Sequence, residues 1–175
     1  MVAFVSLLVI FDSGPLPGDA AVARAVQDTY GVVPASVGDP SELAVFLGLL
    51  VLVPIFALIE RRWRSALWFI AAVVGCILVA GTVQVVLGKG GFPSVSVAEA
   101  VATAALAAYL WWRRFAIGRY LIGALAIADV ALITFLVIDR SEHRPSEALG
   151  GLIFGTAWTI IAVLVAARLQ LAAKS

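Results

Sequence analysis

Long apolar stretches separated by short polar ones run along almost the whole chain. A helix needs roughly 20 mostly apolar residues to cross about 30 Å of hydrocarbon. Five stretches come close to that length, so the pattern predicts membrane-spanning helices over residues 42–59, 65–87, 94–112, 117–138 and 146–168. Residues 2–11 are also apolar, but as a helix they would cover only about 15 Å. We expect a short first span there, which is either shallow or continued by residues upstream of Met1.

The segment between the first two apolar stretches, residues 12–40, has a different pattern. It is rich in glycine and proline, and it mixes short apolar and polar runs. Over residues 20–30 its apolar positions recur at helical spacing, at Val22, Ala25, Val26 and Tyr30. Gln27 and its charged neighbours fall on another face of the same helix. This pattern predicts a small amphipathic helix that lies at the membrane surface.

The composition agrees with a membrane protein. Hydrophobic residues make up 63% of the chain, charged residues 13%, and the mean hydropathy is +1.08; a soluble domain carries about 25% charged residues. The net charge of +1 excludes the basic surface of a nucleic-acid-binding protein, and the single cysteine, Cys76, cannot form an internal disulfide. We therefore predict an all-α fold, a polytopic transmembrane helical bundle of about six spans in a single domain over residues 1–175.

The distribution of positive charge predicts the orientation. Lysine and arginine collect on the cytoplasmic side of membrane proteins. If the spans alternate, eight of the twelve fall on one side. These eight residues are Arg61, Arg62, Arg64, Arg113, Arg114, Arg119, Arg168 and Lys174. We expect a multi-pass protein of the plasma membrane with both termini in the cytoplasm and the loops 88–94 and 139–147 outside.

These two outer loops contain most of the reactive side chains. The first ends at a helix start, where free backbone N–H groups and the helix dipole favour an anion. The second holds the only histidine, His143, and Glu147 follows it by four residues, so that a carboxylate could orient the imidazole. The candidate phosphate-binding residues are Lys89, Ser94, Ser96, Arg140 and Arg144. Charged outer loops also serve simply to keep a membrane protein hydrated, and Pro-Ser at a helix start is common capping chemistry.

Two segments in these loops carry a family pattern. Residues 92–96 read Phe-Pro-Ser-Val-Ser, and residues 143–151 read His-Arg-Pro-Ser-Glu-Ala-Leu-Gly-Gly. They are similar to the F-P-S-G-H and H-x-P-S-D-x-x-x-G segments of the type 2 phosphatidic acid phosphatase superfamily, the membrane lipid phosphate phosphatases. The resemblance covers the chain from about residue 12 to the end. It implies a six-helix bundle with an outward-facing site, in which His143 attacks phosphorus and Glu147 orients it.

The chain also departs from the family pattern. Ser96 stands where the family has the histidine that protonates the leaving group, and a hydroxyl cannot replace an imidazole as an acid near neutral pH. Gln84 stands at the lysine position of the first motif and Val137 at an arginine position of the third. We therefore expect a degenerate member with weak or no catalysis, acting as an accessory subunit or a lipid-phosphate binder. The alternative is a working lipid phosphatase with a phosphohistidine intermediate on His143, whose phosphate clamp Lys89, Arg140 and Arg144 rebuild.

Two acids lie inside predicted spans, Glu99 and Asp129. Ionisable groups in a membrane mark a function or a polar partner. For Asp129 the candidate partners are Thr103, Thr134 or a polar group of another subunit. A small transporter or channel subunit has little support, because only Asp129 lies deep in its span. We expect neither a metal nor a cofactor. The expected partners are membrane lipid, including a lipid phosphate, and other membrane-protein subunits.

Overall fold

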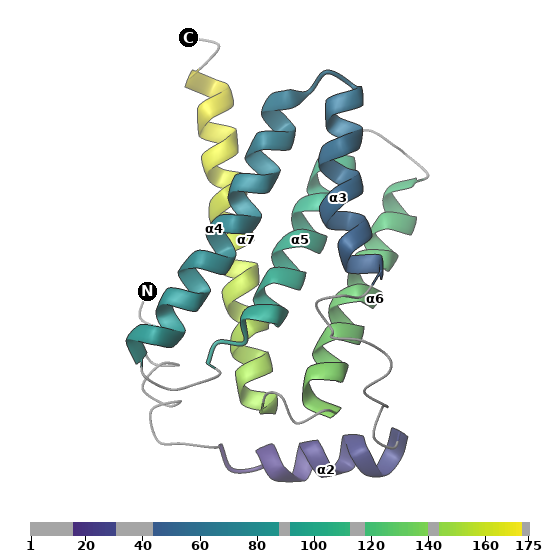
Figure 1. Cartoon of the computed structure of the whole chain (residues 1–175), viewed down its shortest axis with the longest axis vertical. Coiled ribbons are helices and arrows are strands. Elements are labelled where there is room, and N and C mark those ends of the chain that lie inside the picture. The colour runs from purple at the N-terminus through teal and green to yellow at the C-terminus, as the bar shows by residue number, and fades with distance from the viewer. Residues whose placement is uncertain (1–15, 31–43, 88–91, 113–117, 140–143, 173–175) are drawn as a thin grey trace.

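The structure, a computed structural model, describes residues 16–30, 44–87, 92–112, 118–139 and 144–172. In this part of the chain all regular structure is helical, and Figure 1 shows an upright bundle with one helix lying across its end. The helices are α2 (Asp19–Tyr30), α3 (Ala44–Ile59), α4 (Trp63–Leu87), α5 (Val95–Trp112), α6 (Gly118–Asp139) and α7 (Pro145–Ala172). The predicted all-α class is confirmed. The short first span predicted over residues 2–11 lies outside the described residues.

Three of the helices are long and apolar enough to cross a membrane. They contain the segments Trp63–Val86 of α4, Tyr120–Asp139 of α6 and Pro145–Arg168 of α7. The apolar segments described in α3 and α5 are shorter, at Leu49–Ile59 and Val95–Trp111. Of the five predicted full spans, three therefore meet the requirement by length and composition, and two have shorter apolar segments within the described residues.

Helix α5 occupies the centre of the bundle and packs against α3, α4, α6 and α7. Its sequence explains this position, because small residues let neighbouring backbones approach closely from several sides. Buried alanines are distributed around the whole helix, at Ala98, Ala100, Ala102, Ala104 and Ala107. A helix with bulky residues on one side could be covered closely only on the other sides.

The closest of these contacts joins α5 to α7. A Cβ atom built on Gly151 would lie 2.6 Å from the carbonyl oxygen of Ser94, and one built on Gly155 would lie 2.6 Å from that of Ala98. Because the obstacle is backbone in both cases, no side-chain movement could relieve the overlap. Glycine at these two positions of α7 is what allows the two helices to touch.

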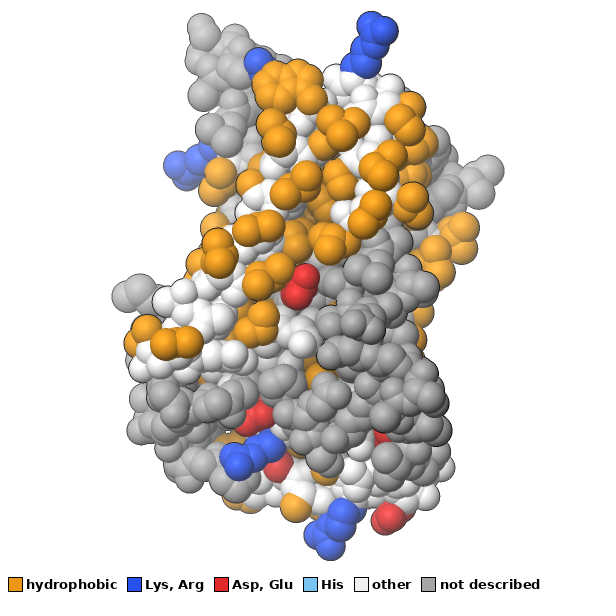
Figure 2. Space-filling model, in the orientation of Figure 1, with side chains coloured by type: hydrophobic (Ala, Val, Ile, Leu, Met, Phe, Trp, Pro, Cys, Tyr) orange, Lys and Arg blue, Asp and Glu red, His pale blue; other side chains and the backbone are white. Residues whose placement is uncertain are grey.

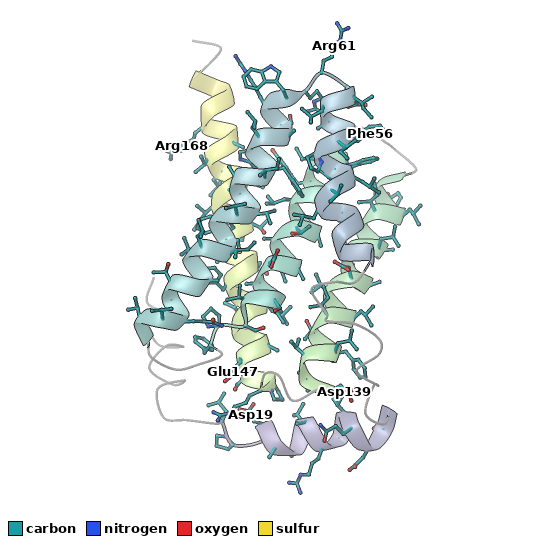
Figure 3. The ribbon with its side chains drawn as sticks, viewed as in Figure 1. Asp19, Phe56, Arg61, Asp139, Glu147 and Arg168 are labelled. Carbon is teal, nitrogen blue, oxygen red and sulfur yellow. The ribbon has the colours of Figure 1, made fainter. Side chains whose placement is uncertain are left out.

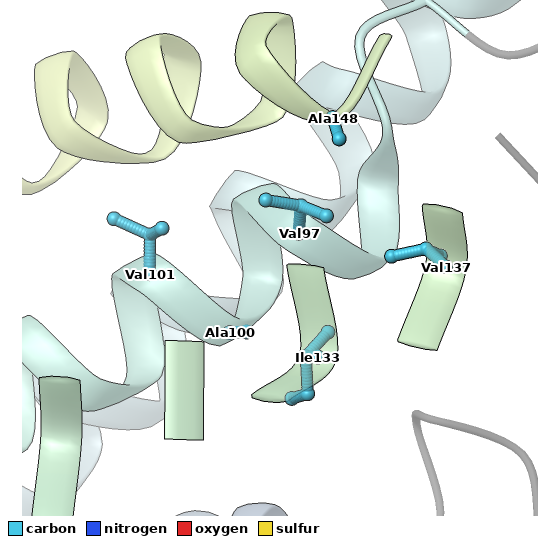
Figure 4. Close-up of a cluster of buried hydrophobic side chains, with 6 residues drawn as sticks. All are labelled: Val97, Ala100, Val101, Ile133, Val137 and Ala148. Carbon is cyan, nitrogen blue, oxygen red and sulfur yellow. The ribbon is translucent and has the colours of Figure 1, made fainter. Parts of the chain in front are cut away.

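A buried cluster joins α5, α6 and α7 at about the level of these glycines (Figure 4). Its members are Val97, Ala100, Val101, Ile133, Val137 and Ala148. A second cluster, which includes Phe69 and Leu106, joins α3, α4 and α5, and a third, around Cys76 and Phe154, joins α4, α5 and α7. The interior is thus continuous along the bundle and centred on α5.

The outer surface of the bundle is apolar as well. Large hydrophobic side chains are exposed along α3, α4, α6 and α7, and Val85 reaches 80% exposure; Figure 2 shows them as a broad area on the face in view. Large contiguous apolar patches are rare on proteins surrounded by water. The surface is therefore suited to contact with lipid.

A tight turn joins α3 to α4. The N–H of Arg61 donates to the carbonyl of Leu58 (2.8 Å) and the N–H of Arg62 to that of Ala57 (2.8 Å), which is the Schellman pattern of a helix end. Arg61 sits in the left-handed region with φ of 57°, a place where glycine is usual. We call this end of the bundle the arginine end, because it carries Arg61, Arg62 and Arg64.

Helix α2 lies across the opposite end (Figure 1), which we call the α2 end, against α6 and α7. The predicted amphipathic helix is present, but its apolar spacing does not mark the face that docks on the bundle. Val22 is 48% exposed, and the residues turned toward the bundle are Asp19, Ala23, Val26 and Gln27. The reason is that α2 docks through polar contacts, which an apolar periodicity cannot show.

Candidate functional site at the α2 end

The predicted catalytic and phosphate-binding residues that the structure describes gather where α5 and α7 begin. Ser94 and Ser96 lie at the start of α5, and Arg144 and Glu147 at the start of α7. The two starts are joined by a hydrogen bond from the N–H of Ser94 to the carbonyl of Glu147 (3.1 Å). Lys89, Arg140 and His143 lie outside the described residues, so their predicted roles stay predictions.

Ser94 is fully buried and caps α5. Its hydroxyl oxygen accepts the N–H of Val97 (3.4 Å), as an N-cap serine does for a helix that begins at the next residue. Ser96, the second residue of α5, is partly buried. The aromatic ring of Phe92 lies against α7, where a Cβ atom on Gly150 would overlap it. This segment is therefore held tightly between two helix starts.

Gln84 has a structural contact. Its side-chain amide donates to the carbonyl of Pro93 (2.7 Å), which links the end of α4 to the start of α5. A lysine, as the family pattern has at this position, would bring a positive charge to the same place. Glutamine instead makes an uncharged hydrogen bond to the backbone just before α5.

The side chain of Glu147 also hydrogen-bonds to a backbone group. Its Oε2 atom accepts the N–H of Arg144 (2.9 Å), which is the half of a capping box that a glutamate supplies at the third position of a helix. The side chain of Arg144 is exposed. Glu147 thus contacts the residue next to His143, while its predicted role of orienting the imidazole stays a prediction.

The residue that sequence reasoning missed is Asp19, the first residue of α2. Its Oδ1 atom accepts the N–H of Ser146 (3.0 Å), and its Oδ2 atom accepts the hydroxyl of Ser146 (2.6 Å) and the N–H of Leu16 (3.0 Å). Asp19 is only 9% exposed. A carboxylate from a distant part of the chain therefore occupies the positive end of the α7 dipole, where anions bind.

A second contact fastens the other half of α2. The side-chain amide of Gln27 donates to the carbonyl of Asp139, the last residue of α6 (3.0 Å). Figure 3 shows Asp19, Asp139 and Glu147 at the α2 end, far from Arg61 and Phe56. These contacts join residues more than 110 positions apart, so local sequence offers no signal for them. The only hint is an aspartate at a helix start.

The electrostatics of the described part of this end are dominated by acids. Asp19 and Glu147 both contact the first turn of α7, while the described cations, Arg24 and Arg144, are exposed. Within the described segments no group of three or more histidine, cysteine, aspartate or glutamate side chains lies close enough to hold a metal ion. Chemically, the described residues can cap helices and link helix ends, and they bring negative charge to the start of α7.

The two intramembrane acids lie at different depths. Glu99 is partly buried on α5, five residues after Ser94. Asp129 is 2% exposed on α6, and neither of its carboxylate oxygens has a hydrogen-bond partner among the described residues. The hydroxyls of Thr103 and Thr134 are equally unpaired there, so the predicted pairing of Asp129 with either threonine is not formed.

A solved structure shows the same arrangement of helices. It is described as the crystal structure of the first transmembrane PAP2 type phosphatidylglycerolphosphate phosphatase from Bacillus subtilis, with a TM-score of 0.74, 12% sequence identity, and coverage of 95% of this chain and 94% of that one. The chain therefore has the fold of a PAP2-type membrane phosphatase. The predicted bundle and its resemblance to lipid phosphate phosphatases are confirmed at the level of the fold, and the chain is a membrane protein.

Comparisons of the sequence alone found no match. No family model matches the chain, and no protein of curated function matches it. At 12% identity the likeness to the Bacillus protein is one of fold alone. The reactive groups of this chain have to be judged by their own contacts.

Proposed function

We propose that this chain is a membrane protein with the PAP2 fold that does not hydrolyse lipid phosphates at an enzyme's rate. It serves instead as an accessory subunit that binds lipid phosphate weakly or not at all. The observation that carries this proposal is the carboxylate of Asp19 on the N–H and the hydroxyl of Ser146. A carboxylate of the chain itself already accepts hydrogen bonds at the start of α7.

The charge of Asp19 opposes a phosphate at the same place. Two unit charges about 4 Å apart repel by about 4 kcal/mol at an effective dielectric constant of 20, which is appropriate near a protein surface. That corresponds to an almost thousandfold loss of affinity. Cationic clamps and preorganised donors provide much of the catalysis in phosphoryl transfer, and here the nearest described groups are acidic.

The absence of a general acid lowers the expected rate of hydrolysis further. A positioned general acid or base contributes about 10²- to 10⁴-fold to a rate, and Ser96 cannot provide it where the family has a histidine. The amide of Gln84 is engaged with the carbonyl of Pro93 and carries no charge. Together these contacts support a scaffold in which the former site has become structural.

The second candidate is a working lipid phosphatase. It is supported by the fold, which matches over 95% of the chain, and by the spacing of His143 and Glu147. The Bacillus protein is described as a phosphatidylglycerolphosphate phosphatase, so a lipid with a terminal phosphate is the natural substrate to test. In this case His143 forms the phosphohistidine, and Lys89, Arg140 and Arg144 hold the phosphate.

Phosphate release from the purified full chain in detergent micelles tests the two candidates. Phosphatidylglycerolphosphate, phosphatidic acid and a polyprenyl pyrophosphate serve as substrates, with the Bacillus phosphatase as positive control. We expect release at the background level, identical for the wild type and for His143→Ala. Turnover comparable with the positive control, abolished by His143→Ala, would establish the second candidate and reject the first.

Two further points belong to this proposal. The eight positive residues on one side support cytoplasmic termini, and a plasma-membrane location is part of the same proposal. A fluorescent reporter that matures only in the cytoplasm, fused after Ser175, should be bright, and a dark fusion would reverse the orientation.

Purification in mild detergent should retain a second membrane protein if the chain is an accessory subunit, and recovery of this chain alone would count against that role.

A further inference from the structure

The charged side chains that the structure describes are divided unevenly between the two ends of the bundle. Those at the α2 end are the acids Asp19, Asp28, Asp139 and Glu147 and the arginines Arg24 and Arg144. Those at the arginine end are Arg61, Arg62, Arg64 and Arg168, together with the acid Glu60. The described part of the arginine end is therefore positive, and the opposite end is acidic.

Three of these arginines, Arg61, Arg62 and Arg64, are exposed at the turn between α3 and α4. The turn is held by its own backbone, because the N–H groups of Arg61 and Arg62 both donate to carbonyls of the last turn of α3 at 2.8 Å. The side chain of Arg61 extends past the end of the bundle (Figure 3). A fixed turn thus presents three positive charges to its surroundings.

Arg61 occupies the one strained backbone position of this turn. Its φ of 57° is a conformation in which glycine is more stable than any residue with a Cβ atom. The guanidinium of Arg61 makes no hydrogen bond or ion pair with another described residue that could offset this strain. Strained residues occur preferentially where a side chain serves in binding, so the environment of this side chain becomes the question.

The neighbours of the turn show which environment it meets. Ile59 before it and Leu67 after it are 72% and 57% exposed, as expected for side chains in contact with lipid. Trp63 is also exposed, and the guanidinium of Arg64 lies over its ring at 5.3 Å. Tryptophan and arginine mark the level where hydrocarbon meets water. The three arginines therefore lie at the level of the lipid headgroups, where anionic phospholipids carry the negative charge.

From these observations we infer that the turn between α3 and α4 is a contact surface for anionic phospholipid headgroups, and that the contact made by Arg61 offsets its backbone strain. Arg62 and Arg64 add to the attraction from the same turn. An arginine near an anionic membrane surface strengthens the association about fivefold, whereas a zwitterionic headgroup has no net charge to attract it. This surface is independent of any reaction at the α2 end.

The thermal unfolding midpoint in two bilayers tests the role of Arg61. The full chain and Arg61→Gly are reconstituted into nanodiscs of phosphatidylcholine alone and of phosphatidylcholine mixed with phosphatidylglycerol. In phosphatidylcholine, we expect Arg61→Gly to unfold about 2–4 °C above the wild type, because the strain is gone. In the anionic mixture this advantage should disappear or reverse, because the variant has lost the lipid contact. The same difference between the two proteins in both bilayers would overturn the inference.

Lipid retention separates this surface from a general attraction of charge. Protein in detergent is equilibrated with equal amounts of phosphatidylglycerol and phosphatidylcholine, and the retained lipids are counted by native mass spectrometry. Arg61→Gln and Arg64→Gln should each lower the preference for phosphatidylglycerol about fivefold, and Arg61→Lys, which keeps the charge, should retain it. The matched control is Arg24→Gln, the same change at an exposed arginine of the acidic end, which should change the preference less than about twofold. Equal losses in Arg24→Gln and Arg61→Gln, or no loss in Arg61→Gln, would show that the turn is not the lipid contact.

Discussion

The contact between Asp19 and Ser146 makes a quantitative prediction about α2. In Asp19→Ala, two hydrogen bonds from Ser146 to a carboxylate are lost, at 3.0 Å and 2.6 Å, together with the favourable interaction of that charge with the α7 dipole. Hydrogen bonds to charged groups contribute roughly 1.5–3 kcal/mol each, and a charge at a helix end about 0.3–1 kcal/mol.

The net effect is smaller than the sum of these terms. When α2 leaves the bundle, Ser146 and Asp19 both regain hydrogen bonds with water, and part of the interaction is returned. We therefore expect Asp19→Ala to weaken the docking of α2 by about 2 kcal/mol, which raises the undocked population about 30-fold. Asp19→Asn keeps one acceptor oxygen and loses the charge, so it should have about half the effect in free energy, close to fivefold in population.

Cysteine labelling can measure this population. The only natural cysteine, Cys76, is fully buried, so a cysteine introduced at Ala23, on the face of α2 turned toward the bundle, becomes the sole reactive thiol. When docking equilibrates faster than labelling, the rate of reaction with a maleimide follows the undocked population. In the Ala23→Cys background, Asp19→Ala should accelerate labelling about 30-fold.

The matched control is Asp28→Ala, which removes an exposed acid from the same helix and should leave the rate within twofold. Labelling that is equally fast with and without Asp19 would mean that the carboxylate does not hold α2. The proposal that it occupies the phosphate position would then lose its support.

Three further predictions concern stability, each measured as the thermal unfolding midpoint in detergent. Arg61→Gly should raise stability by about 1 kcal/mol, because glycine adopts the φ of 57° without strain; a lower midpoint would mean that the arginine side chain makes a stabilising contact. Gly155→Ala should destabilise by about 1–3 kcal/mol, because its Cβ would lie 2.6 Å from the Ala98 carbonyl. Gly81→Ala, with nothing within 4 Å, should be neutral or stabilising, and equal effects of the two would contradict the close α5–α7 contact. Asp129→Leu should stabilise by about 1–3 kcal/mol, since it removes two buried carboxylate oxygens without described partners; a loss of stability would reveal a partner for Asp129.

Much of the fold follows from the sequence because the bilayer imposes a strong constraint on it. Backbone polar groups in hydrocarbon must be paired within a helix, so every long apolar stretch has one available structure. The helix starts at Ser94 and Arg144 were also readable, because Pro-Ser and Pro-Ser-Glu are local capping signals. The resemblance to lipid phosphate phosphatases rested on the same segments, and the fold comparison supports it.

The contacts that define the two ends of the bundle could not be read in this way. The sequence determined that helices form, where they begin, and that the polar residues gather at their ends, since those are local properties of composition and periodicity. Only the tertiary structure decided that α2 turns Asp19 and Gln27 toward the bundle rather than Val22. It also decided that Asp19 reaches Ser146 across 127 positions and that Arg61 takes a left-handed conformation in the turn between α3 and α4. Which polar groups meet depends on how the helices pack, and that packing is set by the small residues of α5 and α7 acting together, which no single stretch of the sequence contains.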